Sequence, residues 1–386
     1  MSASIEGALA DYVREGKVAG VAAMVRHRGR TIFRGAYGCA DLERQTPLDT
    51  SSIFRIASMT KPVTSVAALM LLDDGVFRLD DPITQWLPEF EAMTVLVDPV
   101  GDTLDAIKAA RAITVQDLLT QRSGLAYPLT SAGALCRALR EIGSDVLPEL
   151  PTDDFIAALG RLPLMFQPGQ QWYYGFSTDV LGILVGRAVK STFPDFLRER
   201  LFDPLGMKDT GFQVSPEKLE RLATAYIRDP TTGSLVVYDP PEGRWSREAF
   251  FPSGGAGLVS TLDDYMAFAE MLTLGGATNG RRYLKEETFR LFTANALSAR
   301  ERAMPFMGIE GFWASNGFGL GVSTVVDPQN HPVPTAEGQI GWPGAFGTSW
   351  FADSTNELTG VLMFQEYWSA LPISFDFQAA AYTAIA

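Results

Sequence analysis

Residues 54–75 read FRIASMTKPVTSVAALMLLDDG, and this stretch sets both the expected fold and the expected chemistry of the chain. Apolar side chains recur at helical spacing from Val63 to Leu72, which predicts a buried helix that Gly75 ends. Ser58 and Lys61 stand three residues apart at its start, which is close to one helical turn. We therefore expect a hydroxyl and an amine on one face of this helix.

The Ser58 hydroxyl is a poor nucleophile until a neighbouring base accepts its proton. A lysine that is desolvated between a sheet and helices suits this task. The unpaired amides at the helix start favour negative charge developing near Ser58. The alternative makes Ser58 a helix cap and Lys61 a solvated charge, since the pattern Ser-x-x-Lys also recurs by chance. Pro62 follows Lys61, so we expect an irregular first turn.

A second stretch, residues 168–182, reads PGQQWYYGFSTDVLG. Its apolar pattern predicts a helix with Ser177 or Thr178 as the cap. Tyr174 then lies just before the helix start, where its phenol can relay protons. The alternative is that this aromatic cluster only packs the interface between two regions.

A third stretch, residues 341–347, reads GWPGAFG. Its glycines let the backbone approach a ligand closely, and the amide of Ala345 can point at an oxyanion. The alternative is a tight turn before an edge strand.

Strand patterns lie near both ends of the chain. Residues 21–28 and 31–37, separated by Gly29-Arg30, predict one hairpin. Residues 347–352 and 358–364 predict another at the opposite end. Helical patterns fill the region between them, so the two ends are expected to share one sheet.

The sequence therefore predicts an α+β fold. At 386 residues the chain exceeds the usual size of one domain. We expect residues 1–79 and 215–386 to form an α/β domain with a central antiparallel sheet. Residues 80–214 are expected to form a mainly helical domain inserted beside it.

Charge and hydropathy exclude several classes of function. Lys plus Arg number 32 and Asp plus Glu number 45, a formal net charge of −13, which disfavours nucleic acid as a partner. The longest apolar run, from Val63 to Leu72, is too short to cross a bilayer, so no membrane role is expected. The first residues lack the pattern of a secretory signal, which favours a cytoplasmic location.

Cysteine and histidine are scarce. Cys39 and Cys136 are too few for a disulfide framework or a zinc site. His27 and His331 exclude multi-histidine metal sites and leave few ways to build a Ser-His-Asp triad. No G-x-S-x-G sequence occurs, so serine chemistry here needs another base.

Taken in order and spacing, these stretches resemble the serine β-lactamase and penicillin-binding-protein superfamily, specifically class C β-lactamases and their relatives, the family VIII carboxylesterases. Residues 118–125, LLTQRSGL, and 253–261, SGGAGLVST, support the resemblance, which runs through nearly the whole chain. It implies a β-lactamase/transpeptidase-like fold, with an antiparallel sheet formed by the N- and C-terminal segments and flanked by helices.

The resemblance also implies roles for individual residues. Ser58 would be the acylated nucleophile, Lys61 its partner base and Tyr174 the first residue of the family's Y-x-N element. The backbone N–H groups of Ser58 and Ala345 would form the oxyanion hole. Tyr127 would line the cleft and shape the acyl pocket, with a simple core role as the alternative.

Two departures from the β-lactamase pattern favour the esterase branch. Phe176 stands where β-lactamases place the Asn of Y-x-N, and Trp342-Pro343-Gly344 stands where they place K-T-G. The amide and the ammonium that would hold a β-lactam are therefore missing. We expect Tyr127, Phe176, Trp342 and Gly344 to contact the substrate.

The resulting hypothesis is a serine carboxylesterase that hydrolyses small-molecule esters through an acyl-serine intermediate, without a metal or organic cofactor. The alternatives on the same site are a D-amino-acid amidase or peptidase, a transacylase and a weak β-lactamase. The alternative of another class is a non-catalytic binding protein. The oligomeric state stays open.

Overall fold

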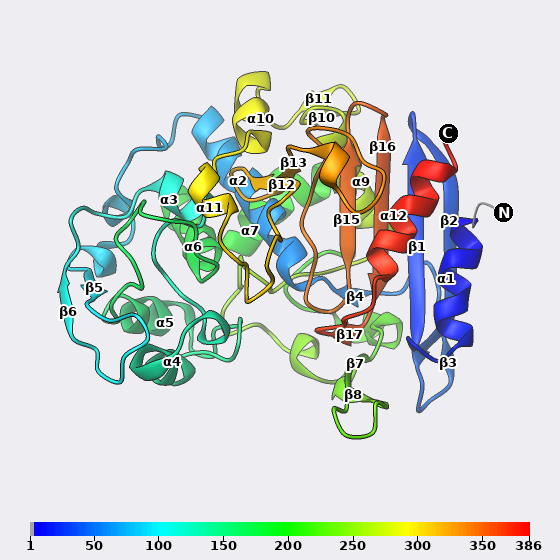
Figure 1. The fold of residues 1–386 in the computed structure, drawn as a ribbon, viewed down its shortest axis with the longest axis horizontal. Coiled ribbons are helices and arrows are strands. Elements are labelled where there is room, and N and C mark those ends of the chain that lie inside the picture. Colours follow the sequence, from blue (N-terminus) through cyan, green and yellow to red (C-terminus); the bar gives the residue numbers. More distant parts are fainter. Residues whose placement is uncertain (1–3) are drawn as a thin grey trace.

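The computed structural model describes residues 4–386, and its main feature is an eight-stranded antiparallel sheet (Figure 1). The strand order is β12-β13-β14-β15-β16-β1-β2-β3. Their bounds, in that order, are Asn316–Phe318, Ser323–Val325, Ile340–Gly341, Ser349–Asp353, Leu358–Phe364, Gly20–His27, Arg30–Asp41 and Thr46–Pro47. Strand β1 pairs with β16 from Val21 opposite Phe364 to His27 opposite Leu358, which confirms that the two ends of the chain share one sheet.

Both hairpins expected from the sequence are present. Strands β1 and β2 are joined by Arg28 and Gly29, both in the left-handed region, as a two-residue hairpin turn requires. The turn therefore lies one residue earlier than expected. Strands β15 and β16 form the second hairpin.

Helices cover both faces of the sheet (Figure 1). Helices α1, Ile5–Arg14, and α12, Ile373–Thr383, pack on one face, where β1 contributes Val21, Ala23 and Val25. Helix α9, Leu262–Thr273, packs on the other face. The β1 residues that alternate with these three project from that face. Because β1 is apolar on both sides, it lies in the interior of the sheet.

The middle of the chain is mainly helical. Its helices are α3, Val115–Leu119; α4, Gly133–Arg140; α5, Thr152–Leu159; α6, Ser177–Val189; α7, Phe193–Leu197; and α8, Asp203–Leu205. It also contains a short hairpin of β5, Thr94–Leu96, and β6, Ala106–Lys108. Helix α2, Thr60–Asp73, packs against α6 and shares one apolar core with the sheet. The division into domains 1–79 with 215–386 and 80–214 stays a prediction.

The remaining elements are short. They are the sheet β17-β7-β8, Glu366–Tyr367, Ala225–Arg228 and Leu235–Asp239; the pair β4, Phe54–Arg55, and β9, Val259–Ser260; the pair β10, Ala277–Thr278, and β11, Arg281–Arg282; and helices α10, Glu286–Thr293, and α11, Ala299–Arg302. None of the helices within residues 4–386 combines the length and the apolar character that crossing a membrane requires.

The start of α2 differs from what Pro62 suggested. A 3₁₀ turn, Ala57–Met59, precedes the helix, and Ala57 has a φ of 40°. Lys61 and Pro62 are both helical, so the irregular turn that was expected at Pro62 is not found there. A first-turn amide has no acceptor within its helix, so proline is tolerated there and the irregularity falls one turn earlier.

Candidate active site

Ser58 lies in the 3₁₀ turn before α2 and is 7% exposed. Its Oγ accepts a hydrogen bond of 2.7 Å from the hydroxyl of Tyr174 and one of 3.4 Å from Nζ of Lys61. Tyr174 reaches this point from the segment just before α6. The serine, the lysine and the phenol that the sequence singled out therefore converge on one oxygen atom.

Lys61 is buried, so the alternative of a solvated first-turn charge is wrong. Its Nζ donates to three acceptors: the carbonyl oxygen of Gly255 at 2.8 Å, the hydroxyl of Tyr127 at 3.2 Å and Oγ of Ser58. It also lies 4.4 Å from the centre of the Tyr174 ring. Three acceptors match the three donors of an ammonium group, which makes its burial tolerable.

Asp179 completes the network, and the sequence patterns did not single it out. Its carboxylate is fully buried and accepts hydrogen bonds from the Tyr127 hydroxyl at 2.9 Å, from the Gly255 amide at 3.1 Å and from the Ser253 hydroxyl. Burial raises the pKa of Asp179, against the opposing effect of the Lys61 charge. An acidic residue in the first turn of α6 was the available signal, and that signal ordinarily indicates only a favourable helix charge.

Tyr127 is completely buried, which favours the alternative of a core role over lining the acyl pocket. Its hydroxyl accepts from Lys61 and donates to Asp179, which makes it a bridge between the two charges. Burial raises the pKa of Tyr127 well above its ordinary value, so this phenol stays protonated and can keep donating to Asp179.

Phe176 is also fully buried, so nothing in the structure supports the expected contact with a substrate. Its ring packs edge-on against Tyr127, with centroids 4.5 Å apart. Phe176 itself occupies the cap position of α6, without a side-chain hydrogen bond. The two residues expected to cap α6 make other hydrogen bonds. The Ser177 hydroxyl bonds to the Ser123 hydroxyl, and the Thr178 hydroxyl accepts from the Gln121 side chain.

The 341–347 segment lies against the residues before Ser58. A side chain at Gly344 would come within 2.3 Å of the carbonyl oxygen of Ile56, so only glycine permits this approach. Gly344 is buried, and its contact with a substrate stays a prediction. Within residues 4–386, the amides of Ser58 and Ala345 make no hydrogen bond to the turns and loops around them, and their role as an oxyanion hole stays a prediction.

Trp342 is buried, and its Nε1 donates to the Tyr174 hydroxyl at 3.4 Å. The indole thus occupies the position where the resemblance led us to look for an ammonium group. Its own contact with a substrate stays a prediction.

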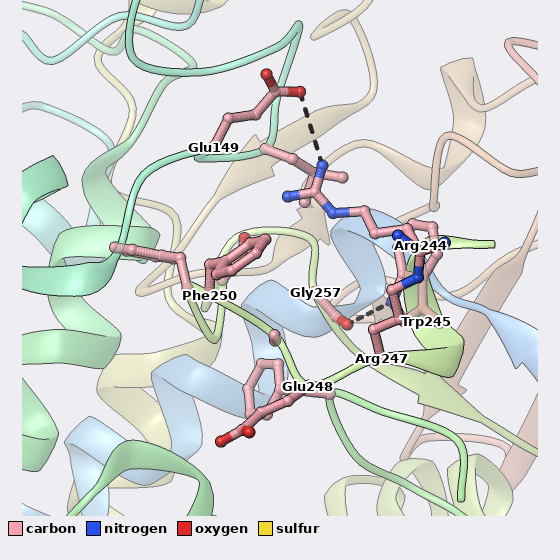
Figure 2. A pocket seen from close by; sticks show the side chains of 12 residues that line it. Glu149, Arg244, Trp245, Arg247, Glu248, Phe250 and Gly257 are labelled. Atoms are coloured by element: carbon pink, nitrogen blue, oxygen red, sulfur yellow. Dashed lines mark hydrogen bonds and ion pairs between the residues drawn. The ribbon is translucent and has the colours of Figure 1, made fainter. Parts of the chain in front are cut away.

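Three cavities border residues of this centre or residues close to them in the chain. One of about 240 Å³ borders Ala57, Ala256 and Ala345. It shares Arg244 and Trp245 with a second cavity of about 390 Å³, where the Arg244 guanidinium points toward Glu149 and the Trp245 indole donates to Gly257 (Figure 2). The third cavity, of about 410 Å³, is lined by aromatic side chains that include Trp172, Tyr174, Phe306 and Trp313.

This arrangement can perform nucleophilic acyl transfer. A hydroxyl lies within hydrogen-bonding reach of an amine and a phenol, which is the set of groups that such a reaction requires. No group of three or more His, Cys, Asp or Glu side chains in residues 4–386 is arranged to hold a metal ion.

Comparison with known proteins gives consistent matches over the whole chain. The Beta-lactamase family profile matches residues 5–371. Protein Rv1367c of Mycobacterium tuberculosis is 37% identical over 360 residues, covering 91% of this chain and 86% of its own. Esterase EstB of Burkholderia gladioli is 30% identical over 399 residues, covering 99% and 95%. The solved structure of EstCE1, a hydrolase with promiscuous acyltransferase activity, has a TM-score of 0.83 at 25% identity, covering 98% of this chain and 97% of that chain.

Proposed function

This chain belongs to the Beta-lactamase family, and from that membership and the geometry of its site we propose that it is a serine carboxylesterase. The similarity to EstB over 99% of the chain supports an ester as the substrate. Phe176 and Trp342 support the same choice, because they supply neither the amide nor the ammonium that would hold a β-lactam.

In the proposed first step, Ser58 Oγ attacks the ester carbonyl carbon, and the carbonyl oxygen accepts hydrogen bonds from the amides of Ser58 and Ala345. One member of the pair Lys61 and Tyr174 enters this step in its deprotonated form and accepts the Ser58 proton. The bond to the alcohol oxygen breaks while Tyr174 protonates that oxygen, which leaves acyl-Ser58. Water activated by the same pair then adds to the acyl group, releases the acid and restores Ser58.

The observation that carries this proposal is the convergence of the Tyr174 hydroxyl and the Lys61 amine on Ser58 Oγ. Replacing Ser58 with Ala is expected to lower kcat by at least about 10³-fold, with the unfolding temperature nearly unchanged. Intact mass after brief incubation with p-nitrophenyl acetate should reveal an acetyl adduct on the native protein and none on Ser58→Ala. Persisting turnover in that variant would contradict the proposal.

Acyl transfer to an alcohol is the second candidate. EstCE1 is described as having promiscuous acyltransferase activity, and the cavity beside Tyr174 is lined by aromatic side chains suited to an apolar alcohol. Such an alcohol would compete with water for acyl-Ser58. This acyl transfer is measured by incubating the protein with p-nitrophenyl acetate and benzyl alcohol and quantifying the benzyl acetate formed by chromatography.

The other activities on the same site are separated by substrate. Turnover of short p-nitrophenyl esters above that of D-amino amides and of nitrocefin supports the esterase, and the reverse order supports an amidase or a weak β-lactamase. Failure of a fluorophosphonate to modify Ser58 would favour a non-catalytic binding protein. The cytoplasmic location stays a prediction.

A further inference from the structure

The cavity of about 410 Å³ beside Tyr174 has aromatic walls that the proposed hydrolysis of simple esters does not use. Trp172 packs edge-on against Phe306 and Trp313, with ring centroids 5.3 Å and 5.0 Å apart. Phe306 also lies edge-on to Tyr174 at 5.5 Å. The phenol that contacts Ser58 Oγ is therefore itself part of the cavity wall.

The cavity offers no unpaired charge. Glu301 is the ionised group in its wall, and Glu301 accepts hydrogen bonds from Arg122 and from the Trp172 amide. The Thr130 hydroxyl, also in the wall, donates to the carbonyl oxygen of Tyr174. These groups are already bonded, and within residues 4–386 the indole Nε1 of Trp172 is a buried donor without a partner. The cavity therefore favours an uncharged, mainly apolar occupant with a flat ring system.

The position of the cavity decides which half of an ester it receives. The carbonyl oxygen lies toward the amides of Ser58 and Ala345, and the cavity of about 240 Å³ borders that side. The leaving oxygen must lie next to the Tyr174 hydroxyl, since this group protonates it. The alcohol half therefore leaves the reaction centre on the side of the Tyr174 ring, whereas the acyl half extends past Ala57 and Ala345.

We propose that the aromatic cavity is an alcohol subsite and that the protein acts on esters of bulky, uncharged alcohols that carry an aromatic ring system. This inference rests on the proposed function, because it uses Tyr174 as the acid that protonates the leaving alcohol. No new chemical step is required: the carbonyl carbon exchanges its alcohol oxygen for Ser58 Oγ and then for water.

Two isomeric esters test the assignment with the same atoms in reversed order. In 2-naphthylmethyl acetate the naphthyl group is on the alcohol side, and in methyl 2-naphthylacetate it is on the acyl side. After each rate is divided by the rate of alkaline hydrolysis of that ester, we expect kcat/KM for 2-naphthylmethyl acetate to be larger by at least about ten-fold, because burying a ring in the cavity stabilises only this orientation.

Variants locate the preference in the cavity. Phe306→Ala should reduce the ratio of the corrected kcat/KM values, 2-naphthylmethyl acetate over methyl 2-naphthylacetate, several-fold. The kcat/KM for ethyl acetate should change less. Met304→Trp should also reduce this ratio, because the larger side chain fills the cavity. Met304 is partly exposed, so the substitution does not require the core to repack. Phe375→Ala removes a partly exposed ring on α12 and should leave the ratio unchanged.

The outcomes separate this inference from the proposed function. A ratio near one, or a preference for methyl 2-naphthylacetate, with an acyl adduct still formed on Ser58, overturns the alcohol subsite and leaves the esterase intact. Absence of hydrolysis of both esters, together with no acetyl adduct on Ser58 from p-nitrophenyl acetate, overturns the proposed function itself. A ratio that persists in both cavity variants also contradicts the subsite.

Discussion

At the residue scale, the main addition to the expected site is a buried pair of opposite charges joined by a phenol. Tyr127 accepts from Lys61 and donates to Asp179, and the Ser253 hydroxyl and the Gly255 amide hold the other side of the carboxylate. A carboxylate in such a place is costly unless hydrogen bonds and an opposite charge compensate it. Asp179 is therefore a positioning residue that fixes the groups around Lys61.

Replacing Asp179 with Asn should weaken both folding and turnover. The variant leaves the Lys61 charge without its opposite charge, so the free energy of unfolding is expected to fall by about 3 kcal/mol. We expect kcat to fall by about 10²-fold, because Lys61 loses its fixed position, while KM changes little. Urea unfolding and steady-state kinetics on the folded variant measure the two effects.

The matched control is Asp154→Asn, which removes an exposed first-turn carboxylate from α5. It should change stability by less than about 1 kcal/mol and leave kcat unaltered. Equal effects of the two substitutions would mean that Asp179 acts only as a helix-terminal charge.

At the element scale, the short helix α11 ties the C-terminal part of the chain to the segment that carries Tyr174. Glu301 on this helix accepts from Arg122 and from the backbone amide of Trp172. Burial alone would raise the pKa of Glu301, but hydrogen bonds from Arg122 and Ser298 outweigh it and lower this pKa from 4.5 to about 2. The same carboxylate thus fixes one wall of the aromatic cavity.

The lowered pKa of Glu301 predicts a pH-dependent contribution to stability. A depressed native pKa stabilises the fold above the unfolded value of 4.5, and this contribution is lost as the pH falls toward about 2. At pH 7, Glu301→Gln should lower the free energy of unfolding by about 2 kcal/mol, allowing for solvent screening. The difference in free energy of unfolding between the native protein and Glu301→Gln, measured by urea unfolding, should become smaller from pH 7 to pH 3.

Glu310→Gln, at an exposed position, serves as the control. Its difference in free energy of unfolding from the native protein should not change between pH 7 and pH 3. A constant difference for Glu301→Gln across this pH range would show that the carboxylate is not held in its ionised form by Arg122.

At the scale of the whole molecule, one apolar core joins the sheet to the helical middle. Met24 and Val361 of the sheet, Leu69 of α2 and Leu181 of α6 belong to the same buried cluster. The β-lactamase/transpeptidase-like fold expected from the sequence is confirmed by the family match and by the similarity to EstCE1. Because α2 lies within this shared core, the position of Ser58 depends on both parts of the chain.

This continuity predicts a single unfolding transition. Leu69→Ala opens a cavity in the shared core and should lower the free energy of unfolding by about 3 kcal/mol. Far-UV circular dichroism and tryptophan fluorescence should report the same shifted midpoint in urea. Two separate transitions, with only one displaced by the substitution, would show that the two predicted domains unfold independently.

Local sequence patterns predicted two hairpins and two helices in their correct order along the chain. Short β-branched and apolar runs predicted the β1–β2 and β15–β16 hairpins, and helical spacing predicted α2 and α6, because these patterns depend on neighbours within a few residues. The spacing of Ser58 and Lys61 belongs to the same local geometry, which holds their side chains on one face.

Only the tertiary structure decided which side chains meet and which are excluded from solvent. Tyr127 and Phe176 were expected to face the substrate, yet packing buries both, and Asp179 lies beside Tyr127 although they are 52 residues apart. A hydrogen bond of this kind depends on how α6 packs against the rest of the chain. No local pattern encodes that distance, because it is set by the close packing of elements remote in sequence.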